Sequence, residues 1–224
     1  MNQKVRIGMV GGGQGAFIGA VHRHAMGMDG QYELVAGVFS RSLENNQQTA
    51  LQLGMDIGRA YSSWQEMLER EAALPADQRI HAITIVTPNA THVPIATAAA
   101  KLGFHVMCEK PLGVNAAEAH ALAETLRTTN TVFTLAHTYI GYPMVWQARH
   151  MVAEGVIGKV RKILVEYPQG WLTDFIEGDN KQAAWRTDPN ESGASGCMGD
   201  IGTHAFNLAE FVTGHQIDRL SAML

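Results

Sequence analysis

Val5-Arg6-Ile7-Gly8-Met9-Val10-Gly11-Gly12-Gly13-Gln14-Gly15-Ala16 is the stretch that decides the fold. Its first half is a mostly apolar run, typical of a buried β-strand. A run of glycines follows at once, and residues 20–28 then have the composition of a helix. Strand, glycine turn and helix in this order form the context of a dinucleotide-binding fingerprint. Gly11 permits the tight turn, and Gly13 lets the backbone approach a pyrophosphate at the helix N-terminus.

The third small position of this fingerprint has two candidates. Ala16 completes a G-x-G-x-x-A pattern, whereas Gly19 completes it only with a short insertion. A glycine run could also be an ordinary flexible turn, but the strand and helix on its two sides favour cofactor binding. The loop residues that we expect to contact the cofactor are Gly11, Gly13, Gly15, Ala16, Phe17 and Ile18.

The second predicted strand, residues 32–39, ends in Ser40 and Arg41 rather than in an acidic residue. The fingerprint expects Asp or Glu here, because a carboxylate accepts hydrogen bonds from the adenine ribose. A hydroxyl and a guanidinium suit a 2′-phosphate instead. These residues predict NAD(P) with a lean toward NADP, although Arg41 could also be a solvated loop charge or stack on the adenine.

Two further apolar strands end in polar residues. Residues 80–86 lead into Thr87-Pro88-Asn89, with His92 in the first turn of the next predicted helix. Residues 104–108 lead into Glu109-Lys110-Pro111. The carboxyl ends of parallel strands meet at one edge of an α/β sheet, where ligands bind. The lysine at this edge is therefore either a functional ammonium or a paired structural charge.

The alternation of short apolar strands with helices predicts an α/β fold with a doubly wound parallel sheet. The pattern changes from His137 onward. Residues 158–167 alternate apolar and charged side chains, as in an antiparallel strand with one face on a core, and residues 217–224 begin another apparent strand. We therefore expect a dinucleotide-binding Rossmann domain at 1–136. The start of an α+β domain with a mainly antiparallel open sheet follows at 137–224.

The composition excludes several classes of protein. Hydrophobic residues make up 46% and charged residues 17% of the 224 residues, so the chain can bury a sizeable core. A net charge of -4 without any lysine or arginine cluster argues against a nucleic-acid partner. No signal peptide or membrane-length apolar run is present. Two cysteines cannot form a disulfide framework, so we expect a cytoplasmic protein.

Asp200 and His204 lie four residues apart in a predicted helix over 200–213, which places them on one face. The pair could be an acid–base constellation, or simply a helix N-terminal aspartate and a half-buried histidine. Zinc binding would need further ligands, and no H-E-x-x-H pattern exists. His22 and His24 in the first helix are expected to be structural or exposed.

Together these motifs resemble the glucose–fructose oxidoreductase, inositol dehydrogenase and rhizopine-catabolism (Gfo/Idh/MocA) family. The resemblance covers essentially the whole chain, and it combines two strand-end motifs with a second-domain signature. The residues that carry it are Gly11-x-Gly13, Thr87-Pro88-Asn89 with His92, Glu109-Lys110-Pro111, Gly155-Val156-Ile157-Gly158, Trp185-Arg186 and Gly199-Asp200-Ile201-Gly202-Thr203-His204.

The resemblance implies a nicotinamide-dependent dehydrogenase that acts on a sugar, cyclitol or related polyol. Lys110 would hydrogen-bond the reacting oxygen, His204 would take the hydroxyl proton, and Asp200 would hold that histidine or a neighbouring substrate hydroxyl. Glu109 would bond the nicotinamide ribose or pair with Lys110. Outside the glycine loop, the expected cofactor contacts are Ser40, Arg41, Thr87, Pro88, Asn89, His92, Glu109, Lys110, Trp185 and Arg186.

The sequence departs from the family pattern in its longer glycine loop and in His137-Thr138-Tyr139, where many members carry an asparagine–arginine pair. Members are generally much longer, so the resemblance implies that only part of the second domain is present and that the full-length form is a homo-oligomer. Two alternatives stay open. One is a cofactor-binding protein of this fold without turnover. The other is a metal-assisted lyase or isomerase that uses His204, Asp200 and His137, although we expect no resident metal.

Overall fold

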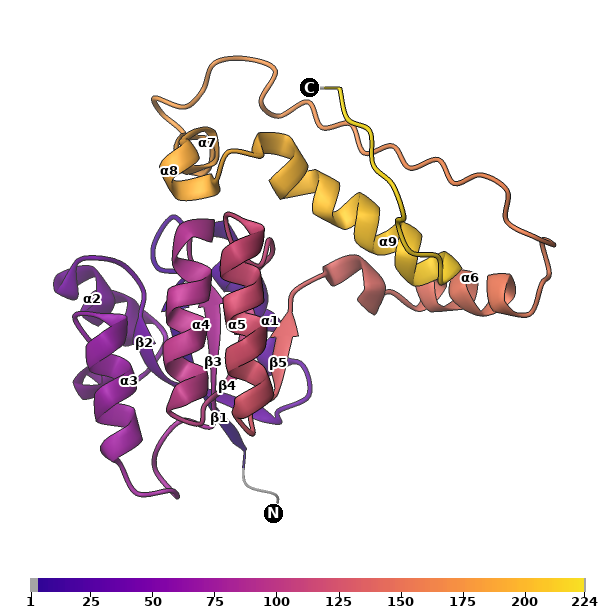
Figure 1. The fold of residues 1–224 in the computed structure, drawn as a ribbon. Coiled ribbons are helices and arrows are strands. Elements are labelled where there is room, and N and C mark those ends of the chain that lie inside the picture. The colour runs from indigo at the N-terminus through magenta and orange to yellow at the C-terminus, as the bar shows by residue number, and fades with distance from the viewer. Residues whose placement is uncertain (1–3, 224) are drawn as a thin grey trace.

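Five parallel strands form the centre of the molecule, in the order β2-β1-β3-β4-β5 (Figure 1). The structure is a computed structural model that describes residues 4–223. Beyond β2, Ala60 forms a single parallel bridge with Gly37, and with this bridge the strand order is that of the dinucleotide-binding fold. The strands are β1 Val5–Gly11, β2 Tyr32–Val38, β3 Ala82–Val86, β4 His105–Cys108 and β5 Phe133–Leu135.

Helices cover both faces of this sheet, because each strand sends alternate side chains to opposite sides. Val10 of β1 packs in a large core cluster under three helices, whereas Met9 packs in a smaller cluster under two. The predicted doubly wound parallel sheet is therefore confirmed. On the large cluster lie α3 Trp64–Ala73, α4 His92–Lys101 and α5 Ala116–Thr128; on the smaller cluster lie α1 Phe17–Gly27 and α2 Leu43–Gln52.

The remaining chain leaves the sheet after β5 and forms helices rather than strands. After the short turn η3 Thr138–Gly141, α6 Pro143–Ala153 packs beside α9 Thr203–Thr213 (Figure 1). Trp146 and Phe211 make an edge-to-face contact with ring centroids 5.0 Å apart, and Arg149 donates to the Phe211 carbonyl at 2.9 Å. Between α6 and α9 along the chain come α7 Lys181–Thr187, α8 Pro189–Ser192 and the π-helical turn η4 Met198–Gly202.

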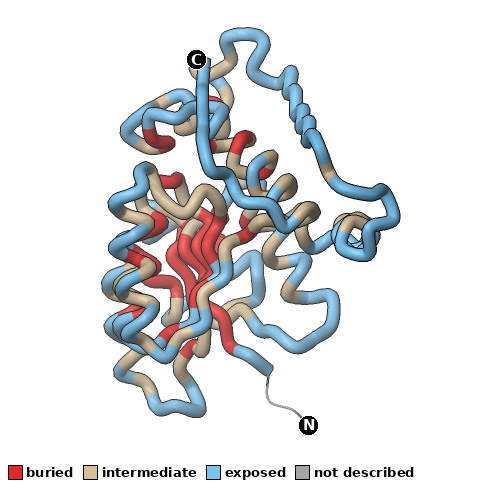
Figure 2. Tube along the Cα trace, turned by 45° about the vertical axis from the view of Figure 1, so that its right-hand side comes forward, coloured by how far each residue is buried: buried red, intermediate tan, exposed pale blue. Residues whose placement is uncertain are grey.

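The antiparallel sheet predicted after His137 is absent from the described residues. Residues 158–167 are extended but unpaired and mostly exposed, as are residues 217–223, while Leu224 lies outside the described part (Figure 2). The alternating side chains suit a strand, but a strand also needs a neighbour for its backbone N–H and C=O groups. No such neighbour lies within residues 4–223. No helix in this range is long and apolar enough to cross a membrane.

Candidate functional site

The loop between β1 and α1 has free space around Gly15 and a close backbone contact between Gly12 and Gly19. A Cβ added at Gly15, where φ is +73°, would meet nothing within 4 Å. A Cβ on Gly19 would lie 2.4 Å from the Gly12 Cα atom, so Gly19 lets α1 pack against β1. Ala16, the other candidate for this role, is the residue before α1 and makes no side-chain cap. The helix therefore begins with N–H groups that have no side-chain partner, which suits a pyrophosphate.

The rest of the loop is tied to the sheet edge. Gly11 lies against Val86 at the end of β3, and Gly13 donates its N–H to the Phe39 carbonyl after β2, at 3.1 Å. Ile18 packs against the smaller core cluster, whereas Phe17 is exposed. This arrangement fits a dinucleotide at the carboxyl edge of the sheet, with Ile18 contributing to packing.

Lys110 lies at the end of β4 and forms an ion pair with Asp200. Its Nζ atom donates to Asp200 Oδ1 at 2.6 Å and to the Asp200 carbonyl at 2.9 Å. The other carboxylate oxygen accepts from Arg186 Nε at 3.2 Å. Burial alone would raise the pKa of Asp200, but the hydrogen bond and charge of Lys110, with Arg186, hold that pKa below its ordinary value. Asp200 therefore joins the sheet edge to α7 as a carboxylate.

Glu109 pairs with a histidine rather than with the Lys110 ammonium. Its Oε1 atom lies 2.8 Å from His22 Nε2, and the other ring nitrogen of His22 lies 2.8 Å from Thr84 Oγ1. His22 was expected to be structural or exposed, and its contact with Glu109 was not predicted. The available signal was its position three residues after Gly19, which places it on the sheet-facing side of α1. The buried chain Thr84–His22–Glu109 fixes the Glu109 carboxylate at the edge.

His204 is 8% exposed and lies among other aromatic rings. Its ring centroid is 4.7 Å from that of Tyr139 and 5.8 Å from that of His137. Burial, followed by the charges of Lys110 and His137, lowers the pKa of His204 to about 4. Burial and the charge of Lys110 also lower the pKa of His137. Both rings are therefore neutral near pH 7, and the buried Nδ1 atom of each has no hydrogen-bond partner among the described residues.

Two predicted contacts in this region are corrected. Asp200 was expected to hold His204 or a substrate hydroxyl. Its carboxylate is bonded to Lys110 and Arg186 rather than to His204, and its contact with a substrate hydroxyl stays a prediction. His92 was expected to contact the cofactor, but it is fully buried. Its two ring nitrogens lie 2.7 Å from the Pro111 carbonyl and 2.8 Å from the Thr87 carbonyl. His92 therefore joins the ends of β3 and β4 from within the fold.

The other predicted residues line the same edge. Thr87 accepts a hydrogen bond from Thr91 at 2.7 Å, and Pro88 precedes the turn η2 Asn89–Thr91. Asn89 donates to the Ser192 carbonyl at 2.8 Å, and its buried Oδ1 atom has no partner within the described chain.

Side chains that follow β2, and side chains of α7, complete this edge. Ser40 is engaged with Asn46, through its N–H at 2.6 Å and its hydroxyl at 3.1 Å. Arg41 contacts Glu191 at 3.1 Å. The Arg186 guanidinium lies 4.2 Å from the centroid of the Trp185 ring. The fold thus brings residues from both halves of the sequence to one edge.

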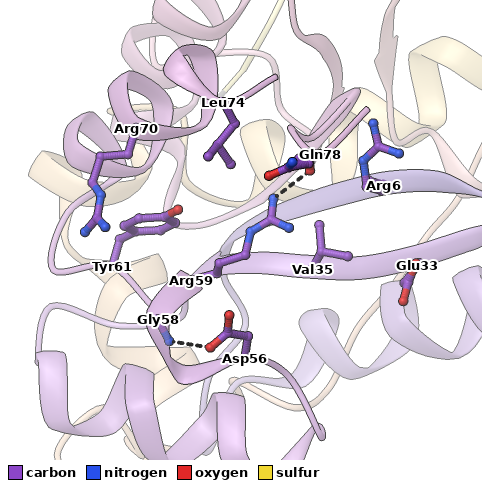
Figure 3. Close-up of a pocket in the computed structure, with 10 residues that line it drawn as sticks. All are labelled: Arg6, Glu33, Val35, Asp56, Gly58, Arg59, Tyr61, Arg70, Leu74 and Gln78. Carbon is purple, nitrogen blue, oxygen red and sulfur yellow. Dashed lines mark hydrogen bonds between the residues drawn. The ribbon is translucent and has the colours of Figure 1, made fainter. Parts of the chain in front are cut away.

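A cavity of about 550 Å³ lies elsewhere, beside the start of β2 (Figure 3). Its arginines already have partners: Arg59 binds Glu71 at 3.0 Å and the Gln78 carbonyl at 3.3 Å, and Arg6 binds the Arg79 carbonyl at 2.7 Å. None of the predicted site residues lines it. Within residues 4–223 no group of three metal-ligating side chains could hold an ion. The carboxyl edge is therefore the candidate site.

Comparison with known proteins agrees with this geometry. The model of the Gfo/Idh/MocA oxidoreductase family, described as an NAD-binding Rossmann fold, matches residues 5–137. The chain belongs to this family. The model of the Gfo/Idh/MocA C-terminal domain also matches residues 145–224.

Individual relatives of this Gfo/Idh/MocA chain are dehydrogenases and other oxidoreductases. The oxidoreductase YfiI of Bacillus subtilis is 33% identical over 95% of the chain, and levoglucosan dehydrogenase of Pseudarthrobacter phenanthrenivorans is 31% identical over 95%. The chain spans 54% and 52% of these two proteins. An inositol dehydrogenase homologue from Azotobacter vinelandii, solved with NAD+, superimposes with a TM-score of 0.90 at 38% identity, over 94% of this chain and 54% of that one.

Proposed function

We propose that this chain belongs to an NAD(P)-dependent dehydrogenase or reductase that transfers hydride between the nicotinamide and a sugar, cyclitol or related polyhydroxy substrate. The observation that carries the proposal is the Lys110–Asp200 ion pair beside a buried neutral His204, at the edge where the glycine loop opens. The names of the levoglucosan dehydrogenase and inositol dehydrogenase relatives support a polyhydroxy substrate.

Residues 1–136 form the cofactor domain in this proposal, and residues 137–224 supply the substrate side. When bound, the nicotinamide accepts or donates the hydride. The N-terminus of α1 binds the pyrophosphate, because its first N–H groups have no side-chain cap. Glu109, held by His22, accepts a hydrogen bond from the nicotinamide ribose. Trp185 and Arg186, stacked on each other, border the nicotinamide pocket.

Lys110 stabilises the reacting oxygen of the substrate. An ammonium group has three N–H donors, and Asp200 takes two of them through its carboxylate and its carbonyl. The third remains for a ligand oxygen. A fixed positive charge at this point stabilises the negative charge that develops on the oxygen as its proton leaves. Asp200 keeps the ammonium in place, and Arg186 keeps Asp200 in place.

His204 takes the proton of the substrate hydroxyl. Its lowered pKa keeps the imidazole neutral, so the ring can accept a proton throughout the neutral pH range. A base with a pKa of about 4 is weak on its own, and Lys110 therefore has to favour loss of the proton by stabilising the negative charge that this loss leaves on the substrate oxygen.

We also propose that residues 158–167 act as one strand of an antiparallel sheet whose neighbouring strand comes from outside residues 4–223. Ile163, Val165 and Tyr167 are all exposed here, although their spacing is that of one strand face. This sheet would also form the interface of a homo-oligomer. The two free cysteines, Cys108 and Cys197, support a reducing cytoplasmic location.

Replacement of Lys110 or His204 tests the catalytic roles. Lys110→Ala and His204→Ala are each expected to lower turnover by roughly 10²–10⁴-fold with a sugar and cyclitol panel, while NADH binding by fluorescence stays within about threefold. Lys101→Ala, an exposed lysine on α4, is the control and should retain full turnover. A fully active His204→Ala variant would refute the base assignment. A chain that binds NADH tightly but turns over no member of the panel would support the non-catalytic alternative.

A further inference from the structure

Arg41 at the end of β2 is not a free charge. Its Nη2 atom lies 3.1 Å from Oε1 of Glu191, a residue of α8 that is 150 positions away in the sequence. The Arg41 side chain is 89% exposed and that of Glu191 is 29% exposed. The sequence favoured NADP because it has Arg41, and no acidic residue, at the end of this strand. The folded chain brings a carboxylate to that position from its second half.

Buried contacts on either side hold Glu191 in place. The next residue, Ser192, is buried and accepts a hydrogen bond from buried Asn89 through its carbonyl at 2.8 Å. Gly193 lies so close to Val114 that an added Cβ would be 3.1 Å from the Val114 Cβ atom. Asp188 caps the start of α8 by accepting from the Asn190 N–H at 2.9 Å. The segment that carries Glu191 is therefore anchored to the sheet edge, and the ion pair does not depend on a free loop.

We propose that Glu191 selects NAD over NADP by supplying the carboxylate that the end of β2 lacks. This inference rests on the proposed function, since it requires a dinucleotide at the carboxyl edge. In Rossmann domains an acidic residue at the end of the second strand hydrogen-bonds the ribose hydroxyl of NAD, whereas an arginine accommodates the 2′-phosphate of NADP. Here the two residue types occupy that position together as an ion pair.

The charges decide which of the two prevails. A 2′-phosphate brings a charge of roughly -1.5 to -2 at pH 7, and Glu191 repels it. Glu191 also neutralises Arg41, which would otherwise attract the phosphate. The 2′-hydroxyl of NAD has no charge and can donate to the carboxylate. Because the pair is partly exposed and screened by salt, we expect a selectivity of modest size.

The test is a binding titration of NADH and NADPH to the 224-residue chain, followed by nicotinamide fluorescence. Glu191→Gln is expected to lower the Kd for NADPH relative to that for NADH by roughly three- to tenfold. Glu154→Gln, which makes the same charge change on exposed residue 154 after α6, is the matched control and should leave the ratio unchanged. The shift should shrink at about 0.5 M NaCl, because the interaction is between exposed charges.

A second variant separates the attraction of the 2′-phosphate by Arg41 from its repulsion by Glu191. Adding Arg41→Ala to Glu191→Gln is expected to remove most of the gain in NADPH affinity, since the released guanidinium provides that gain. The inference is overturned if wild type binds both cofactors and Glu191→Gln leaves their Kd ratio within twofold, or if Glu154→Gln shifts the ratio equally. If wild type binds neither cofactor, the proposed function fails and this inference fails with it.

Discussion

Residues 4–136 and residues 137–223 differ in the contacts that stabilise them. In the first region, strands and helices enclose large apolar side chains such as Phe104, Ile83 and Leu122, all fully buried. Figure 2 shows the buried positions concentrated in the central sheet. In the second region, Ala183 is the buried apolar side chain among the described residues, and the other buried positions there are glycines, Ser192 and His204. The first region therefore has a hydrophobic core, whereas the second has none of comparable kind.

The second region is attached to the first through polar contacts at the candidate site. Lys110 binds Asp200, Asn89 binds the Ser192 carbonyl, and Arg41 binds Glu191. These contacts join the end of β4 to η4, and the ends of β3 and β2 to α8. The difference teaches that stability and chemistry are separated in this chain. The core stabilises the sheet, and the polar edge orders the residues proposed to act on the substrate.

The largest expected effect comes from removing a core side chain. Phe104→Ala should lower the free energy of unfolding by about 3–5 kcal/mol, because it loses apolar burial and leaves a cavity in the larger cluster. Leu164→Ala in the second region, where the side chain is 75% exposed, should change it by less than about 0.5 kcal/mol. Urea unfolding monitored by circular dichroism measures both. Equal losses in the two variants would contradict the contrast between the regions.

A smaller effect is expected from pH through His204. Its pKa falls from an ordinary 6.5 to about 4 on folding, so unfolded chains take up a proton between these pH values while folded chains do not. The free energy of unfolding should therefore be highest above pH 6.5 and fall by up to about 3 kcal/mol as the pH drops to 4. The free energy of unfolding of the His204→Gln variant should fall less over this pH range.

The matched comparison is wild type against His204→Gln in thermal or urea unfolding at several pH values. His92, whose pKa is also lowered, contributes in both proteins and cancels in the difference, whereas His137 interacts with His204 and cancels only in part. Asp200 is an acid, whereas His204 is a base. Its lowered pKa raises the free energy of unfolding, and this contribution is lost only as the pH falls through that lowered pKa. Parallel curves for the two proteins between pH 6.5 and 4 would rule out a depressed His204 pKa.

The smallest expected effect compares one helix cap from each region. Ser63 accepts from the Glu66 N–H at 3.2 Å and starts α3, while Asn180 accepts from the Gln182 N–H at 2.8 Å and starts α7. Ser63→Ala should lower the free energy of global unfolding by about 1 kcal/mol. Asn180→Ala should leave global unfolding almost unchanged and speed proteolysis around residues 170–187 roughly fivefold, because α7 opens locally. A global loss from Asn180→Ala would show that the regions unfold together.

Local patterns predicted the sheet domain and most of its edge. Apolar runs located β1 to β4, because periodicity depends on neighbouring residues. The same patterns failed at residues 158–167, where the alternation is real but pairing requires a distant strand. They also missed α7 within a stretch rich in glycine and tryptophan, although Asn180 is a good cap. His22 was expected to be structural or exposed, but its partner could not be predicted because Glu109 is 87 positions away.

The sequence by itself determined the Rossmann sheet, the glycine loop, the strand-end residues and the presence of Asp200 and His204 on one helical segment, since each depends on short-range spacing. Only the tertiary structure decided which charges meet. In the folded chain Asp200 pairs with Lys110 rather than with His204, and Glu191 pairs with Arg41. His92 is buried. The physical reason is that ion pairing depends on distances of a few ångströms between residues far apart in the chain, and the fold alone sets those distances.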